Sequence, residues 1–389
     1  MKTNSRILLS IFALTFAVLA CSSVEDGIHT DPSEVASQNL SGHDLSYRDL
    51  AGFDLSGKNL QGANLSGANL FSANLTGADL RNADLNHAKV SSANFSQADL
   101  RGANLRWVCF EDANWTDAKI DEKWKKIIEL VKFGVKPGAD LQEYDFSDAC
   151  LRNDEVDNLD GISLSGVDMQ GVNITEAYMA YANLEGAKLS ESNAQKVDLW
   201  GSNLRLVDFS NANLAGADLS EAHANGANFT GADVRGADMR NLCFEEAIWT
   251  GVKIDAEWKL LFGIISNIKP EQDLRNINLK ETCLESRDLS GVDLSGSDIS
   301  DANWSWINLQ GANMTGAILD GTRLIGANLQ NVDFSQALLE STDLYHANLT
   351  GALVTKKQLE GAFLQCTVVP DGTFGTWDTS KCNDLPSMP

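Results

Sequence analysis

The chain has 389 residues, with 54 acidic side chains against 30 basic ones and a formal net charge of −24 at pH 7. This balance argues against binding of nucleic acid or anionic lipid through basic patches. The acidic excess follows from a repeating position that is filled by Asn or Asp, so we interpret most of the charge as a solvated face.

Residues 1–20 have the features of a secretory signal peptide. Lys2 and Arg6 give a basic start, and a mostly apolar run of thirteen residues, Ile7 to Leu19, follows. A small residue then precedes Cys21, an arrangement that resembles the lipobox of bacterial lipoproteins. A run of thirteen residues is too short to span a bilayer, so we expect no retained transmembrane anchor. The lipobox resemblance implies that Cys21 becomes a lipidated N-terminus, and we expect a flexible tether over residues 21–37. The alternative is an ordinary signal peptide with an incidental cysteine.

A five-residue period fills most of the remaining chain. In the first block, residues 38–120, an apolar residue recurs at every fifth position from Leu40 to Ile120, which makes seventeen units. Between Ala63 and Ala118, eleven of the twelve residues two places before this central residue are alanine. A period of five matches neither a helix nor a strand, so we expect a narrow stacked coil in which the alanine and the central residue both point inward.

The motif Ala-Asn/Asp-Leu resembles the signature of the pentapeptide-repeat family, and the likeness extends over nearly all of the mature chain. The resemblance implies an all-β solenoid, a right-handed quadrilateral parallel β-helix with four units per coil. No unit can bury its own leucine, so stability must come from stacking on neighbours. Each buried leucine contributes roughly 1.5–3 kcal/mol.

Two insertions interrupt the period and define the domain organisation. Residues 121–138 separate the first block from a second block over residues 139–254, and residues 255–271 separate that block from a third over residues 272–354. The second block loses its register near residues 156–160. The insertions are related, because residues 106–128 and 240–262 are identical at twelve of twenty-three positions. This indicates an internal duplication.

Each insertion predicts a short amphipathic helix. Asp121 and Asp255 stand at N-cap positions. The apolar residues with helical spacing are Trp124, Ile127, Ile128 and Val131 in the first, and Trp258, Leu261, Phe262 and Ile265 in the second. We expect both helices to pack on the solenoid and to cover coil edges at the breaks, rather than to bind a partner.

The two ends of the solenoid depart from the pattern. Large or polar residues fill the small inward position of the first coil, which predicts an N-terminal cap; they are Gln38, His43, Arg48, Phe53 and Lys58. Residues 355–389 lose the period and are interpreted as a C-terminal cap and tail. There Leu359 and Phe363 are expected to cover the last coil.

Six cysteines besides Cys21 predict disulfides, because an even number in an exported protein favours bridges. The duplication favours the pairs Cys109–Cys150, Cys243–Cys283 and Cys366–Cys382. The first two pairs flank the insertions, and their members occupy the outward position before the central residue. Adjacent coils would place such Cα atoms at a distance suitable for a disulfide. Free thiols or a metal site are the alternatives, but the sequence contains no CxxC or His–Cys cluster.

No catalytic motif is visible. The sequence has no nucleophile elbow, P-loop, HExxH or dinucleotide fingerprint, and its five histidines are scattered. We therefore expect no enzyme activity, no cofactor and no metal site. Trp107 and Trp200 occupy outward positions, which favours either a binding surface or packing against a coil edge.

These features favour a non-enzymatic, lipid-anchored solenoid that acts as a structural or protein-binding module at the bacterial cell envelope. Its protein partner is not indicated, and no direct contact with nucleic acid is expected. Because Ser22 follows Cys21, we expect an exported lipoprotein, at the outer membrane or on the periplasmic side of the envelope. The alternative is an acidic DNA mimic that protects or inhibits a type II topoisomerase, as the resemblance to the family allows.

Overall fold

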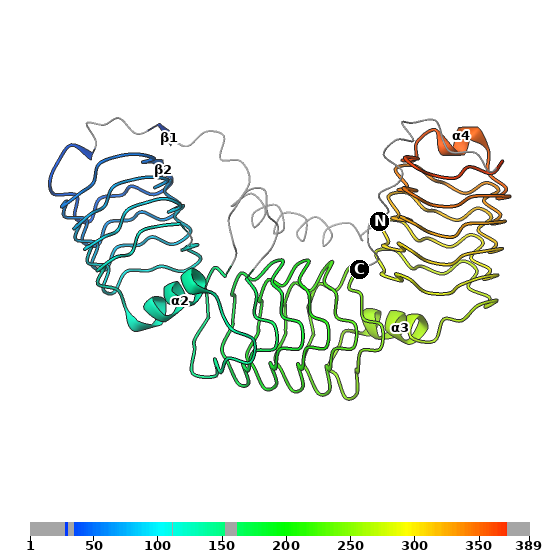
Figure 1. Cartoon of the computed structure of the whole chain (residues 1–389), viewed down its shortest axis with the longest axis horizontal. Coiled ribbons are helices and arrows are strands. Elements are labelled where there is room, and N and C mark those ends of the chain that lie inside the picture. The colour runs from blue at the N-terminus through cyan, green and yellow to red at the C-terminus, as the bar shows by residue number, and fades with distance from the viewer. Residues whose placement is uncertain (1–27, 30–34, 111, 152–161, 372–389) are drawn as a thin grey trace, which may run out of the picture. The chain divides into compact units, whose positions relative to one another are not determined.

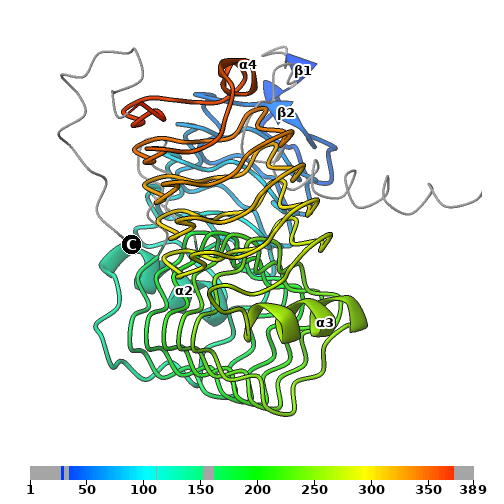
Figure 2. The same ribbon diagram turned by 90° about the vertical axis from the view of Figure 1, so that its right-hand side faces the viewer.

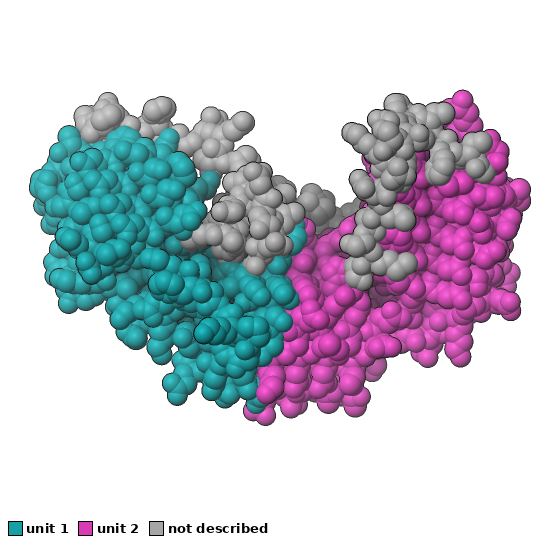
Figure 3. Space-filling model, in the orientation of Figure 1, with its two compact units in different colours: residues 1–183 teal, residues 184–389 magenta. Residues whose placement is uncertain are grey.

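The structure is a computed structural model that describes residues 28–29, 35–110, 112–151 and 162–371. It contains two compact units, Met1–Asn183 and Leu184–Pro389 (Figure 3), each a solenoid of stacked coils (Figure 1). The elements are β1 (Ile28–His29), β2 (Arg48–Asp49), α2 (Glu122–Phe133), α3 (Ala256–Ile265) and α4 (Lys356–Leu359). Among the described residues, no helix combines the length and apolar character that crossing a membrane requires.

Each regular coil contains twenty residues, or four five-residue units. Parallel bridges join residues twenty apart on four ladders, which include Asn39↔Asn59, Asp44↔Asn64, Asp49↔Asn69 and Asp54↔Asn74. The amide of Leu65 donates to the carbonyl of Asp84 in the next coil, and that of Asn64 donates to His43 in the previous one. Figure 2 shows successive coils before α3 lying behind one another with their corners aligned. The backbone of each coil is thus satisfied by its two neighbours.

The interior is filled by one central residue from each unit. Leu65, Leu70 and Leu75 are fully buried, and the alanines two places before them have relative exposures of 0–1%. The residue two places after the centre turns the chain with a positive φ, as in Gly67. Side chains at this corner point outward and can cover the next coil. The Trp306 ring covers Gly326 of the next coil so closely that a Cβ atom on Gly326 would overlap the ring.

The solenoid begins earlier than predicted. β1 pairs with β2 in parallel, with Ile28 opposite Arg48, and Val35 is buried at a central position. The twenty-residue register therefore enters residues 21–37, which we expected to be a flexible tether. The first coil lacks the inward alanine that marks the other units, so its sequence does not reveal the period.

The solenoid also continues past Val354. Bridges Asp343↔Phe363 and Asn348↔Val368 add to the ladders. Leu359 of α4 is buried as expected, but Phe363 is 62% exposed, so the prediction that it covers the last coil is wrong. Phe363 takes the outward ladder position instead, opposite Asp343. A capping box between Thr355 and Gln358 starts this helix.

Helices α2 and α3 lie where the duplicated insertions predict helices, and each packs against aromatic residues of the coil core. The Trp124 ring of α2 lies 5.7 Å from that of Phe110, and the Phe262 ring of α3 lies 4.2 Å from that of Phe244. Both helices therefore cover the end of a coil stack. The twenty-residue spacing is interrupted at a third place, where no helix is described. The bridge Asp140↔Asp168 spans twenty-eight residues instead of twenty, around the undescribed residues 152–161.

Asp121 and Asp255 precede these helices, but neither side chain caps its helix. The Asp121 carboxylate accepts a hydrogen bond from the amide of Gly102 at 3.1 Å, and that of Asp255 accepts one from Gly236 at 2.7 Å. Each aspartate therefore supplies the acceptor that the missing next coil would have provided. Its role is to close the ladder at the break rather than to start the helix.

The outward Asn/Asp position stabilises the stack through a second ladder of side chains. The Oδ1 of Asn64 accepts from the amide of Ser66 at 3.1 Å, and its Nδ2 donates to Oδ1 of Asp44 in the previous coil at 3.1 Å. The same bond recurs between Asn74 and Asp54 at 3.0 Å. An asparagine can both accept and donate in this arrangement, whereas an aspartate can only accept. Alternation of Asp with Asn is therefore favourable.

Asp218 violates this alternation, because it lies between Asp198 and Asp238 on one ladder. Burial and the neighbouring Asp238 raise the pKa of Asp218 above 3.8, although hydrogen bonds from Ser220 oppose the shift. The folded state thus binds a proton at Asp218 more readily than the unfolded state does. Ionisation of Asp218 therefore lowers stability at pH values above its pKa in the folded state.

We predict that Asp218→Asn stabilises the protein at pH 7 by roughly 0.2–1 kcal/mol, the range of a cross-strand pair. The amide removes a charge and can donate to Asp198. The advantage should shrink as the pH falls through the raised pKa toward 3.8, because the wild-type carboxyl then becomes neutral. Urea unfolding at several pH values measures it. The control Asp208→Asn should bring no gain, since Asp208 already accepts from Asn228. A loss of stability at pH 7 in Asp218→Asn would contradict this explanation.

Candidate functional site at the two breaks in the repeat

Disulfides cross both breaks between regular blocks. At the first break Cys109 bonds Cys150 with a Cα–Cα distance of 4.9 Å, and at the second Cys243 bonds Cys283 with a distance of 5.0 Å. In the chain-entropy model, closing a loop of this size contributes roughly 4 kcal/mol. Cys366 is buried, whereas Cys21 and Cys382 lie outside the described residues.

Trp107 joins three coils at the first break. Its amide donates to the Asp148 carbonyl at 2.7 Å, and its indole Nε1 donates to the Glu176 carbonyl one coil further on at 2.8 Å. The ring stacks on His87 with a centroid distance of 4.5 Å, and the Arg106 guanidinium lies over the ring, 5.0 Å from its centroid. Burial and nearby Arg106 lower the pKa of His87, which favours a neutral imidazole in this stack. The Trp107 side chain thus packs neighbouring coils together at the first break.

Asn241 has the same role at the second break. Its amide donates to the Glu281 carbonyl at 2.7 Å, and its Nδ2 donates to the Asp301 carbonyl at 3.0 Å and to Glu221 at 3.1 Å. Its Oδ1 accepts from the amide of Asn303 at 3.1 Å. Asn241 is buried, with a relative exposure of 6%. One amide group therefore connects coils on both sides of the break.

Trp107 and Asn241 are 134 residues apart, the offset of the duplication. Both take a positive φ, 54° and 53°, at the corner of a coil, and both donate to a carbonyl two coils ahead. The duplication has thus kept a hydrogen bond while exchanging an indole donor for an amide donor. The sequence gives no sign of this shared role, because the two side chains are chemically unlike.

Ion pairs also cross the second break. The Arg323 guanidinium donates to both oxygens of Glu221 at 2.6 and 2.7 Å. These residues lie four coils apart along the stack, which would separate them by about 19 Å in a straight solenoid. The coils on this side of the break must therefore converge. A weaker contact joins Arg287 and Glu245 at 3.8 Å.

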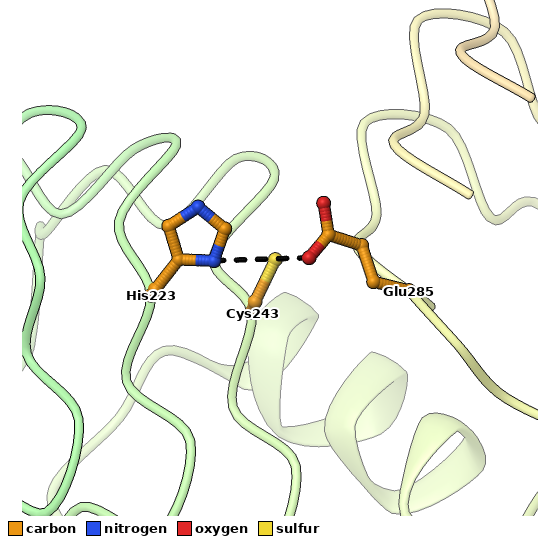
Figure 4. Close-up of side chains that lie close together, drawn as sticks. All are labelled: His223, Cys243 and Glu285. Atoms are coloured by element: carbon orange, nitrogen blue, oxygen red, sulfur yellow. Dashed lines mark ion pairs between the residues drawn. The ribbon is translucent and has the colours of Figure 1, made fainter. Parts of the chain in front are cut away.

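A third cross-break pair belongs to a cluster of metal-ligand type (Figure 4). His223 Nδ1 lies 3.7 Å from Glu285 Oε2, and the ligand atoms of His223, Cys243 and Glu285 all lie within 4.8 Å of one another. Beside them is a hollow of about 20 Å³, enough for about one water molecule. The Cys243 sulfur is bonded to Cys283, so this cluster holds no thiolate nucleophile while the disulfide is intact.

Sequence reasoning placed Cys243 and Cys283 here but missed His223 and Glu285. His223 precedes Cys243 by twenty residues and Glu285 follows Cys283 by two. A coil length of twenty, which the family resemblance implies, would have brought them together. No His–Cys cluster is visible among residues close together in the sequence, because His223 and Cys243 are twenty residues apart. Trp200, predicted to face outward, is 38% exposed.

The sequence matches the family model for pentapeptide repeats over residues 39–77, 78–114, 158–193, 202–241, 288–324 and 317–355. These matches comprise eight copies and together cover more than half of the chain. Among curated proteins there is no match.

Solved structures of pentapeptide repeat proteins show similarity. Rfr23 from the cyanobacterium Cyanothece 51142 is 26% identical over 26% of this chain and 66% of its own, just under two thirds, with a TM-score of 0.22. HetL, involved in heterocyst differentiation regulation in the cyanobacterium Nostoc sp. strain PCC 7120, is 24% identical over 82% of this chain and 91% of its own, with a TM-score of 0.15.

A trypsin-treated form of QnrB1, a plasmid-mediated fluoroquinolone resistance protein, is 14% identical over 61% of this chain and 91% of its own, with a TM-score of 0.21. TM-scores this low support no argument beyond the repeat pattern itself.

We predict that Asn241→Gly lowers the free energy of unfolding by about 1–3 kcal/mol, because it leaves buried polar partners without their hydrogen bonds. Glycine accepts the positive φ, so backbone strain does not contribute. Urea unfolding under oxidising conditions measures the loss. The matched control is Gln336→Gly, at an exposed corner with a φ of 61°, where the change should be clearly smaller. Equal losses would show that Asn241 acts only through its backbone.

Proposed function

Because this chain belongs to the pentapeptide-repeat family, we propose that it is a non-enzymatic, lipid-anchored solenoid serving as a structural or protein-binding module at the bacterial cell envelope. The observation that carries the proposal is the pair of disulfides at the breaks. Such bridges persist in oxidising compartments and are rare in the cytosol. They therefore support export, as do the apolar run and Cys21 of the first residues.

We further propose that the coils form the right-handed quadrilateral β-helix typical of this family. The four ladders per twenty residues support it. In such a coil the stacked central side chains fill the interior, which leaves no cavity for a substrate. Catalysis would have to occur on an outer face, and there the polar side chains are largely engaged in the Asn/Asp ladder.

Three large apolar side chains are exposed on the final coils. Leu338, Leu353 and Phe363 occupy outward ladder positions, where the other coils mostly carry polar residues, and are 53%, 61% and 62% exposed. These positions belong to three different ladders, so the three side chains lie on separate sides of the coils and form no single apolar patch. The partner is expected to be a protein of the envelope.

The DNA-mimic alternative requires acidity concentrated along a face. In the described coils asparagines stand among the aspartates on most ladders, and several aspartates are paired with an arginine two residues later, such as Asp79 with Arg81 and Asp233 with Arg235. These neutral and paired neighbours argue against a continuous acidic face and support the envelope proposal over the DNA mimic. Protection of a type II topoisomerase by the unexported protein would favour the alternative.

The proposal predicts that a C-terminally tagged full-length chain fractionates with membranes and incorporates labelled fatty acid. Cys21→Ala should lose the label and leave the membrane fraction, because the thiol that carries the lipid is gone. The adjacent variant Ser22→Ala is the control and should retain both properties. Cell fractionation with fatty-acid labelling measures this. Cytoplasmic recovery of both the wild type and Cys21→Ala would contradict export and anchoring.

A further inference from the structure

The cluster at the second break contains four side chains that can bind a transition metal. His223 Nδ1, Cys243 Sγ and a Glu285 oxygen lie within 4.8 Å of one another (Figure 4). Cys283 Sγ is bonded to Cys243. Ligand atoms of a tetrahedral zinc site, at bond lengths of about 2.0–2.3 Å, lie about 3.3–3.8 Å apart. A shift of about 1 Å in the side chains would meet that spacing.

The surroundings already orient one of these ligands and leave a second one unpaired. Asn303 Nδ2 donates to Glu285 Oε1 at 2.6 Å, which leaves Oε2 directed at His223. The His223 Nδ1 atom is buried and has no hydrogen-bond partner in the described structure, apart from the 3.7 Å contact with Glu285. Hydrogen bonds that fix ligand side chains in this way are typical of metal sites.

We propose that reduction of the Cys243–Cys283 disulfide creates a Zn²⁺ site formed by His223, Cys243, Cys283 and Glu285. A dithiol supplies the reduction: it is oxidised to a disulfide while two electrons and two protons pass to the cysteine sulfurs. Zn²⁺ then displaces the two thiol protons and binds the thiolates. While the disulfide is intact the sulfurs carry no charge, so the site is closed. A Zn²⁺ site would thus replace the disulfide as the cross-link at this position of the solenoid.

The first break provides an internal comparison. Its disulfide occupies the same ladder position, but Lys89 stands one coil before Cys109, where the second break has His223. In the sequence Arg152, which lies outside the described residues, follows Cys150 by two places, as Glu285 follows Cys283. Two cationic residues cannot bind Zn²⁺. If the cysteines of both breaks served only as disulfide cross-links, the residues beside them would not be expected to be cationic at one break and metal-binding at the other.

Co²⁺ tests the proposal, because thiolate-bound Co²⁺ has a charge-transfer absorption. The purified full-length chain is reduced anaerobically with a phosphine, which takes an oxygen atom from water to become a phosphine oxide, and the excess is then removed. We expect the reduced chain to bind Co²⁺ with this absorption, and Zn²⁺ to displace the Co²⁺. The oxidised chain should not show it. Cys109→Ser/Cys150→Ser should retain it.

His223→Lys and Glu285→Arg reproduce the residues of the first break and should each weaken Co²⁺ binding at least tenfold. Circular dichroism of every variant, in oxidised and reduced form, identifies any that lose their fold. His223→Gln provides a milder second variant and should also bind at least tenfold more weakly. Unchanged affinity in folded His223→Lys and His223→Gln, or no Co²⁺ binding by the folded reduced wild type, would overturn the proposal. Binding by an unfolded reduced chain would do the same.

Discussion

The hydrogen bond from the amide of a central residue to the carbonyl nineteen residues later determines the rest of this structure. It sets the coil at twenty residues, as in Leu65 to Asp84 and Leu214 to Asp233. With that register, every central side chain stacks on another central side chain, and every outward Asn or Asp stacks on its counterpart. Each coil buries its core and satisfies its backbone only through neighbours. An interruption anywhere in the register therefore exposes both an apolar core and a row of unpaired polar groups.

The two breaks show how the chain responds to that exposure. α2 and α3 cover the core with aromatic contacts, and Asp121 and Asp255 accept amides that have lost their usual partners. A disulfide then restores contact between ladder positions forty or forty-one residues apart. Trp107 and Asn241 add a hydrogen bond to the coil beyond. Covalent and polar contacts are concentrated where the repeat itself provides none.

The sequence was most informative where the repeat is regular. The repeat pattern led correctly to the solenoid, the buried leucines and the outward Asn/Asp position, because each is imposed twenty times or more by the same local motif. It failed at β1, where the motif is degenerate, and at Phe363, which has an ordinary ladder position despite its apolar side chain. It also missed His223 with Glu285, and the common role of Trp107 and Asn241. Those contacts join residues from separate coils, so they depend on coil length and on convergence at the break rather than on any local pattern.

Coil length is the quantity on which this account depends, and paired cysteines measure it directly. Asn74→Cys/Asn94→Cys places thiols twenty residues apart on one ladder, in the arrangement of the two native bridges. We predict that this pair forms a disulfide on oxidation, as judged by peptide mapping. Asn74→Cys/Lys89→Cys, fifteen residues apart, should keep free thiols. A bridge in the fifteen-residue pair, or none in the twenty-residue pair of a folded protein, would contradict a coil of four units.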